Sequence, residues 1–210
     1  MDTRTNGLDH LAGATNDGKR TIELEAPYLV ALTVEGVAPF LFHRWSVDAI
    51  AEKAAARKGS RAKKEDDIES YVYRDPVTNE LAIPAEYFRQ SLIHAAKYSQ
   101  DPRSPRKSAM DLFKAGVVAL TDLCPLGTAA WDYLDRRRVM VQRNGITRTR
   151  PAMHAGWTAQ MELQVLLPEY IGPALLGEVL QRAGKLVGVG DFRPTYGRFM
   201  VTKFQVSLIG

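Results

Sequence analysis

The residues best suited to binding a charged partner gather in one short stretch. Residues 136–150 contain six arginines and no acidic residue. Guanidinium groups bind phosphates in bidentate fashion and stack on nucleobases. The stretch therefore indicates contact with a nucleic acid. The alternative is a solvated hairpin whose charges only keep it soluble. The arginines are Arg136, Arg137, Arg138, Arg143, Arg148 and Arg150.

The arginines lie in two β-prone arms around Asn144-Gly145, a pair that predicts a two-residue type I′ hairpin turn. In that register Arg143 pairs with Ile146 and Val141 with Arg148. Alternation along the strands then divides the arginines between the two faces of the ribbon. Because neither face is wholly apolar, we expect a ribbon that protrudes rather than one that is buried.

A second candidate site is a glycine-rich loop, residues 186–198, with glycines at 188, 190 and 197. Glycines let backbone N–H groups approach an anion closely. Phe192, Arg193 and Tyr196 add faces on which bases stack. The loop follows a predicted helix and precedes a strand, the reverse of the order in Rossmann and P-loop sites. A helix C-cap followed by a tight turn explains the glycines equally well.

The third candidate is the run His43-Arg44-Trp45, just after the first predicted strand. His43 could act as a general base in RNA cleavage, although a lone histidine is more often structural. Acidic residues show no metal-ligand spacing, and Cys124 is the only cysteine. We therefore expect no metal and no cofactor. The predicted nucleic-acid contacts are His43, Arg44, Trp45, Arg136, Arg138, Arg143, Arg148, Arg150, Gly188, Gly190, Phe192, Arg193 and Tyr196.

Composition is that of an ordinary globular chain. The 210 residues include 28 basic and 24 acidic side chains, for a net charge of +4, and 45% are hydrophobic. With one cysteine, no intrachain disulfide can form, which suits a reducing compartment. We find no signal-peptide pattern and no apolar stretch of about 18 residues. The sequence therefore predicts a cytoplasmic protein with no membrane contact.

The elements that must position these residues follow a recognisable order. Periodicity predicts strands over 21–35, 131–141, 157–167 and 198–208 and helices over 84–98 and 173–185. This βαββαβ order predicts an α+β, ferredoxin-like (RRM-like) palm. We expect a flexible arm over 1–20 and a single domain over 21–210, with a helical and basic insertion over 46–80.

This order, the basic hairpin and the glycine-rich loop together resemble the RAMP (repeat-associated mysterious protein) superfamily, above all the CRISPR subunits that coat guide RNA. The resemblance implies that residues 136–150 are a thumb and that copies assemble along the strand, with other ribonucleoprotein subunits as partners. PFLFHRW (39–45) and the glycine-rich loop also resemble small uncharacterised phage and prophage proteins, which implies a bacterial host cell.

Three hypotheses follow. The first is a non-catalytic protein that binds single-stranded nucleic acid and self-associates into a filament or ring. RNA is favoured, and a phage setting would allow single-stranded DNA. The second is a metal-independent RNA endonuclease of the RAMP type that uses His43 as base, with Arg44 stabilising the phosphorane. The third is a structural or protein-interaction module.

Overall fold

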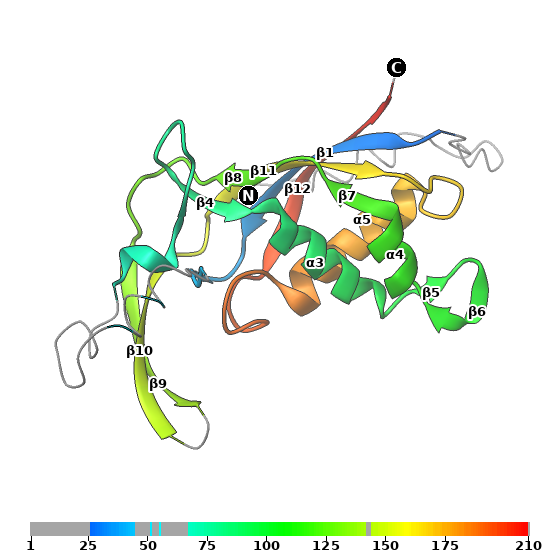
Figure 1. The fold of residues 1–210 in the computed structure, drawn as a ribbon. Coiled ribbons are helices and arrows are strands. Elements are labelled where there is room, and N and C mark those ends of the chain that lie inside the picture. The colour runs from blue at the N-terminus through cyan, green and yellow to red at the C-terminus, as the bar shows by residue number, and fades with distance from the viewer. Residues whose placement is uncertain (1–25, 45–50, 52–54, 56–66, 142–143, 210) are drawn as a thin grey trace, which may run out of the picture.

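The structure is a computed structural model that describes residues 26–44, 51, 55, 67–141 and 144–209. The predicted arm at 1–20 and most of the insertion before residue 67 lie outside the described residues, as do Trp45 and Arg143. The described part is a mixed α+β fold with several antiparallel sheets, as the sequence predicts (Figure 1).

The main sheet has four strands in the order β12-β1-β11-β7, and every neighbouring pair is antiparallel. Its central strand β1 (Tyr28–Gly36) pairs with β11 (Thr158–Val165) and β12 (Phe199–Leu208). Along β1 the residues Tyr28, Val30, Leu32 and Val34 are buried, and the residues between them are more exposed. This alternation is typical of a sheet with one face on the core and one in water.

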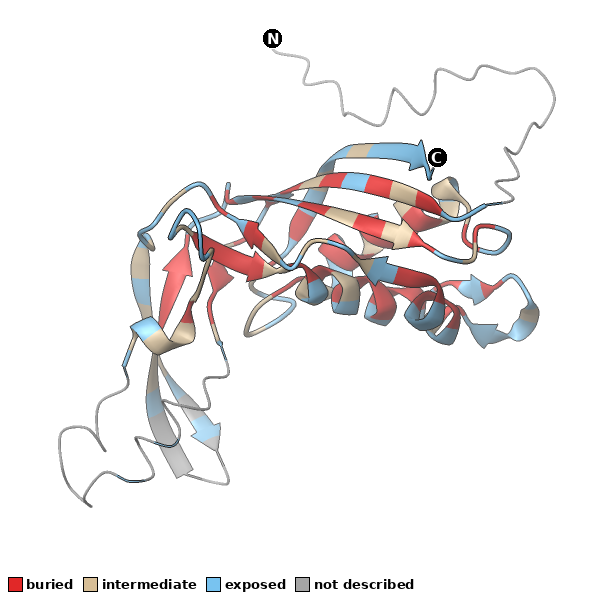
Figure 2. Cartoon of the chain, turned by 45° about the horizontal axis from the view of Figure 1, so that its top comes forward, coloured by how far each residue is buried: buried red, intermediate tan, exposed pale blue. Residues whose placement is uncertain are grey.

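Helices cover one face of this sheet. α3 (Ala85–Ala96), α4 (Met110–Gly116) and α5 (Pro173–Arg182) lie on the same side, and buried residues gather between them and the strands (Figures 1 and 2). The predicted stripe Phe88, Leu92, Ala95 and Ala96 is buried, so the helical periodicity is confirmed. A one-turn π-helix, η2 (Ala183–Val187), continues α5 toward the glycine-rich loop. In the described part of the chain no helix is long and apolar enough to cross a membrane.

The prediction that residues 131–141 form a strand of the main sheet is wrong. β9 (Tyr133–Val141) pairs with β10 (Asn144–Met153), and β10 pairs with β2 (Phe40–Leu41) in a separate sheet. The place beside β11 is taken by the short strand β7 (Val117–Ala119). The physical reason is that β9 offers no apolar face to the helices, whereas Val117 of β7 is fully buried.

The hairpin of β9 and β10, called the arginine hairpin below, projects from the rest of the molecule, as expected (Figure 1). The predicted turn at Asn144-Gly145 is wrong, because Asn144 pairs with Val141 and both Asn144 and Gly145 lie in β10. The observed register places Arg148 opposite Arg137 and Arg150 opposite Asp135. Because the shift is by an even number of residues, each side chain keeps its predicted face.

Two smaller units flank the hairpin and the helices. β3 (Tyr73–Arg74), β4 (Leu81–Pro84) and β8 (Leu123–Pro125) form a three-stranded sheet, preceded by a 3-10 turn, η1 (Glu69–Tyr71). β5 (Gln100–Asp101) and β6 (Ser104–Ser108) form a short hairpin beyond the end of α3.

Candidate nucleic-acid interface

The base of the arginine hairpin packs against the glycine-rich loop through Arg137. Its guanidinium carbon lies 4.8 Å from the ring centre of Phe192 and 4.7 Å from that of Tyr196. One Arg137 nitrogen also donates a 2.6 Å hydrogen bond to the Tyr196 hydroxyl. Hydrogen bonding to Asp135 raises the pKa of Arg137. The two rings that the sequence offers to nucleobases are therefore already in contact with an arginine of the same chain.

Arg150 makes the second contact between hairpin and loop, and this contact is buried. Its side chain is 3% exposed, and its Nη2 lies 2.6 Å from Oδ2 of Asp191. The Phe192 ring centre is 4.9 Å from the guanidinium carbon. Burial lowers the pKa of Arg150, and the charge of Asp191 opposes this change. A guanidinium enclosed in this way anchors the hairpin and is not presented to a phosphate.

The glycines of the loop serve close packing. Gly188, Gly190 and Gly197 have φ of 73°, 77° and 69°, in the left-handed region that favours glycine. A Cβ at Gly190 would lie 2.5 Å from Phe40 and one at Gly197 only 1.7 Å from the Val189 carbonyl oxygen. The N–H of Gly188 donates to the Ala183 carbonyl at 2.8 Å. Gly188 therefore caps the C-terminus of η2, in agreement with the interpretation of the loop as a helix C-cap followed by a tight turn.

The loop is also bonded to the segment that carries His43. The N–H of Asp191 donates to the Leu41 carbonyl at 3.2 Å, and the N–H of Gly197 donates to the Pro39 carbonyl at 2.7 Å. These bonds hold β2, and so the start of the His43 segment, against the loop. The structure thus brings together all three segments that the sequence singles out.

His43 lies at this junction, half-buried, with its ring stacked on Tyr71 at 5.6 Å between centres. Burial lowers the pKa of His43; Asp191 raises it, and Arg150 and Arg148 lower it further. His43 is therefore mostly neutral at pH 7. Its Nδ1 is enclosed and has no hydrogen-bond partner within the described ranges. One ring nitrogen of His43 is therefore enclosed by the protein, and the ring packs against Tyr71.

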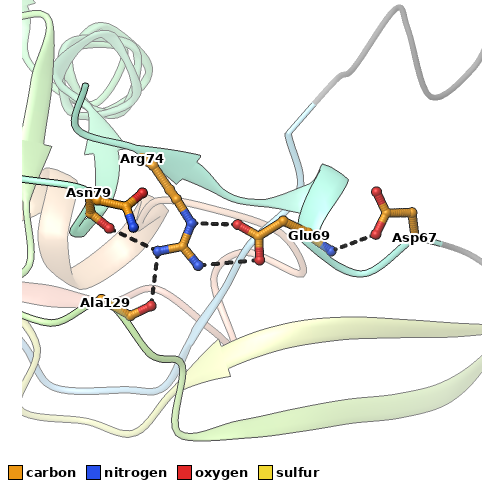
Figure 3. A network of polar contacts seen from close by, with 5 residues as sticks. All are labelled: Asp67, Glu69, Arg74, Asn79 and Ala129. Atoms are coloured by element: carbon orange, nitrogen blue, oxygen red, sulfur yellow. Dashed lines mark hydrogen bonds and ion pairs between the residues drawn. The ribbon is translucent and has the colours of Figure 1, made fainter.

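A polar network holds η1, which carries Tyr71, in place. Arg74 is ion-paired with Glu69 and donates 2.9 Å hydrogen bonds to the carbonyls of Asn79 and Ala129 (Figure 3). The N–H of Glu69 donates to Asp67 at 3.2 Å. Next to this network, the N–H of Arg44 donates to the Tyr71 carbonyl at 2.9 Å. The network thereby fixes the platform on which His43 is stacked.

The other arginines remain accessible. Arg136 and Arg138 lie on the opposite face of the hairpin from Arg137, and both are exposed, as is Arg193 on the loop. Arg148 is half-buried, and exposed Arg44 lies over Tyr73 at 5.3 Å from the ring centre. Asp135 is ion-paired with Arg137, and Asp191 is ion-paired with Arg150. The sequence does not predict either aspartate as a functional residue. Only the nearness of Asp135 to the arginine run signals such a pairing.

Comparison with known proteins finds a similarity of fold but no similarity of sequence. No family model matches the chain, and no curated protein matches it. Among solved structures, the chain is similar to a chain of "Cryo-EM structure of the Type III-B Cmr-beta bound to cognate target RNA". The identity is 12% and the TM-score 0.52, and the match covers 96% of this chain. This chain spans 65% of the length of the matched chain. The two share a fold.

Proposed function

We propose that the protein is a non-catalytic, RAMP-type protein that binds single-stranded nucleic acid, with RNA as the favoured ligand. The proposal includes a ferredoxin-like palm, and the order of β1, α3, β7, β11, α5 and β12, with the smaller elements set aside, supports it. The fold similarity to a chain from an RNA-bound complex supports the choice of RNA.

The observation that carries the proposal is that some arginines of the hairpin anchor it to the loop while others remain exposed. Arg137 and Arg150 anchor the hairpin to the loop, whereas Arg136 and Arg138 on the opposite face of the hairpin, and Arg193 on the loop, remain exposed. A protruding ribbon that is anchored at its base and carries exposed guanidinium groups suits binding to successive phosphates, because its backbone loses little conformational freedom on binding. A hairpin that served only solubility would not need a buried ion pair at its base.

In the proposed mechanism, phosphates contact the outer face of the arginine hairpin, and the strand continues toward Arg193 on the loop. Arg148, which is half-buried, contributes where its guanidinium reaches solvent. Trp45 and Arg143 remain predicted contacts. Copies of the protein would assemble along the strand, as the RAMP resemblance implies, with a filament or ring as the product and other ribonucleoprotein subunits as partners.

The test compares affinity for a fluorescent single-stranded RNA, measured by anisotropy. We expect Arg136→Ala/Arg138→Ala to weaken binding about tenfold or more, since each variant residue loses a charge-assisted contact. The control Lys114→Ala/Lys203→Ala removes the same charge from exposed positions on α4 and β12 and should change affinity less than threefold, an order-of-magnitude expectation. Equal losses in the two variants would contradict a defined interface.

A second assay addresses catalysis. Labelled RNA incubated with excess protein in EDTA should stay intact, because the proposed function has no catalytic step and His43 is stacked on Tyr71 with its Nδ1 enclosed. Products that end in a 2′,3′-cyclic phosphate and disappear in His43→Ala would replace the proposal with the endonuclease hypothesis. A parallel titration with single-stranded DNA measures the preference for RNA.

A further inference from the structure

A hollow of about 500 Å³ opens where the end of α3 meets the glycine-rich loop. The helix end contributes His94, Lys97 and Tyr98, and the loop contributes Leu186, Val187 and residues 190–194. The volume lies within the range of pockets that hold small ligands. His94, Lys97 and Tyr98 are not among the contacts that the sequence predicts.

The walls of the hollow combine positive charge with flat or apolar surface. His94, Lys97 and Arg193 supply the basic groups, and Asp191 is the acidic residue of the lining. Since Asp191 is ion-paired with buried Arg150, its charge is largely compensated. Tyr98 is 55% exposed and Leu186 45% exposed, which leaves an aromatic and an aliphatic surface open to a ligand. Cations beside an open aromatic ring are typical of sites that hold a phosphate and stack its base.

Helix electrostatics alone does not account for this arrangement. Basic residues near a helix C-terminus offset the negative end of the helix dipole, which explains His94 and Lys97 at the end of α3. It does not explain Arg193, which comes from the loop, or the open face of Tyr98. Lys97 already lies 4.7 Å from the centre of the Tyr98 ring, so charge and ring are placed together.

The hollow is also continuous with the hairpin junction. Asp191 and Phe192, which contact Arg150 and Arg137 on the hairpin, line the hollow as well. A strand that passes from the hairpin across the loop would therefore reach the hollow.

We propose that this hollow binds one nucleotide of the strand, with its base against Tyr98 and Leu186 and its phosphate beside Lys97 and Arg193. This inference rests on the proposed function and adds to it a contact with a base. It predicts that the protein distinguishes a strand with bases from a bare sugar-phosphate chain.

The experiment measures the affinity of wild-type and Tyr98→Ala protein for two probes, oligouridine and an abasic oligomer of equal length. Loss of one stacked base should weaken oligouridine binding roughly 5- to 100-fold in Tyr98→Ala. Binding of the abasic oligomer should be the same for both proteins. Tyr170→Ala is the matched control, since Tyr170 is 39% exposed and lies outside the hollow. Lys97→Ala/Arg193→Ala should weaken binding to both probes.

Photo-crosslinking of the wild-type protein to 4-thiouridine RNA gives a readout independent of variant folding, and Tyr98 or Leu186 should carry the crosslink. If Tyr98→Ala binds oligouridine as the wild type does and the crosslink lies elsewhere, the hollow is not a nucleotide site, although the proposed function stands. If Arg136→Ala/Arg138→Ala also binds as the wild type does, or if the wild type binds neither probe, the proposed function fails as well.

Discussion

Removal of the Arg150 charge should loosen the anchor of the arginine hairpin. Arg150→Met keeps most of the side-chain volume but leaves Asp191 without its buried counter-ion, which lies 2.6 Å away. Removing one partner of a buried pair costs about 3–5 kcal/mol. Asp191 is 28% exposed and can regain water, and its Oδ2 accepts no hydrogen bond among the described residues, so the pair is not ideally aligned. We therefore expect a loss of about 2–3 kcal/mol.

That loss corresponds to a fall in Tm of about 4–12 °C for a domain of this size. Urea unfolding of Arg150→Met, Asp191→Asn and the double variant forms a cycle that isolates the pair. We expect the double variant to be more stable than the sum of the single effects predicts, by about 1–3 kcal/mol, because no unpaired charge remains. The exposed pair Arg182 and Glu178 on α5 is the control, with a coupling below about 0.5 kcal/mol. Additive effects at Arg150 and Asp191 would refute the anchoring role.

Three further predictions follow from the surroundings of single residues. Burial lowers the pKa of His43, so the unfolded chain binds a proton more readily than the folded chain does. The free energy of unfolding should therefore fall as the pH drops below about 6.5, and His43→Gln should reduce that fall in urea melts at several pH values. A pH profile that is the same in His43→Gln and wild type would contradict this prediction. Burial raises the pKa of Cys124 to about 12, so the thiol should resist a maleimide until the protein unfolds; rapid labelling of native protein would show that the site is open. Gly190→Ala would place a Cβ 2.5 Å from Phe40, at a backbone position with positive φ. Thermal melts should therefore show that the free energy of unfolding falls by about 1–3 kcal/mol. An unchanged Tm would mean that the loop does not need a glycine here.

The local elements could be predicted from sequence because their signals are local. The stripe from Phe88 to Ala96 predicts α3, and the alternation in 157–167 predicts β11, which spans Thr158–Val165. The partner of each strand depends on distant residues. The lack of an apolar face in 131–141 argues against a place in the main sheet, but nothing near these residues shows that β7 takes the place beside β11.

The site was predictable in its segments but not in the role of each residue. The three segments do meet, and alternation correctly separates Arg136 and Arg138 from Arg137 and Arg150. Tertiary packing decides which face of the arginine hairpin meets the loop. Because the face with Arg150 meets the loop, Arg150 is buried there and pairs with Asp191. The Asn144-Gly145 signal failed because a local turn preference is outweighed by the pairing along the whole strand.

The salt dependence of RNA affinity tests the central claim most directly, because it counts the phosphates that the protein neutralises. Contact with three to five phosphates predicts that log K falls with log salt at a slope of roughly 2–3.5. Removing the exposed charges in Arg136→Ala/Arg138→Ala/Arg193→Ala should lower that slope by about 2. A wild-type affinity that hardly changes with salt, or a triple variant with an unaltered slope, would contradict the account.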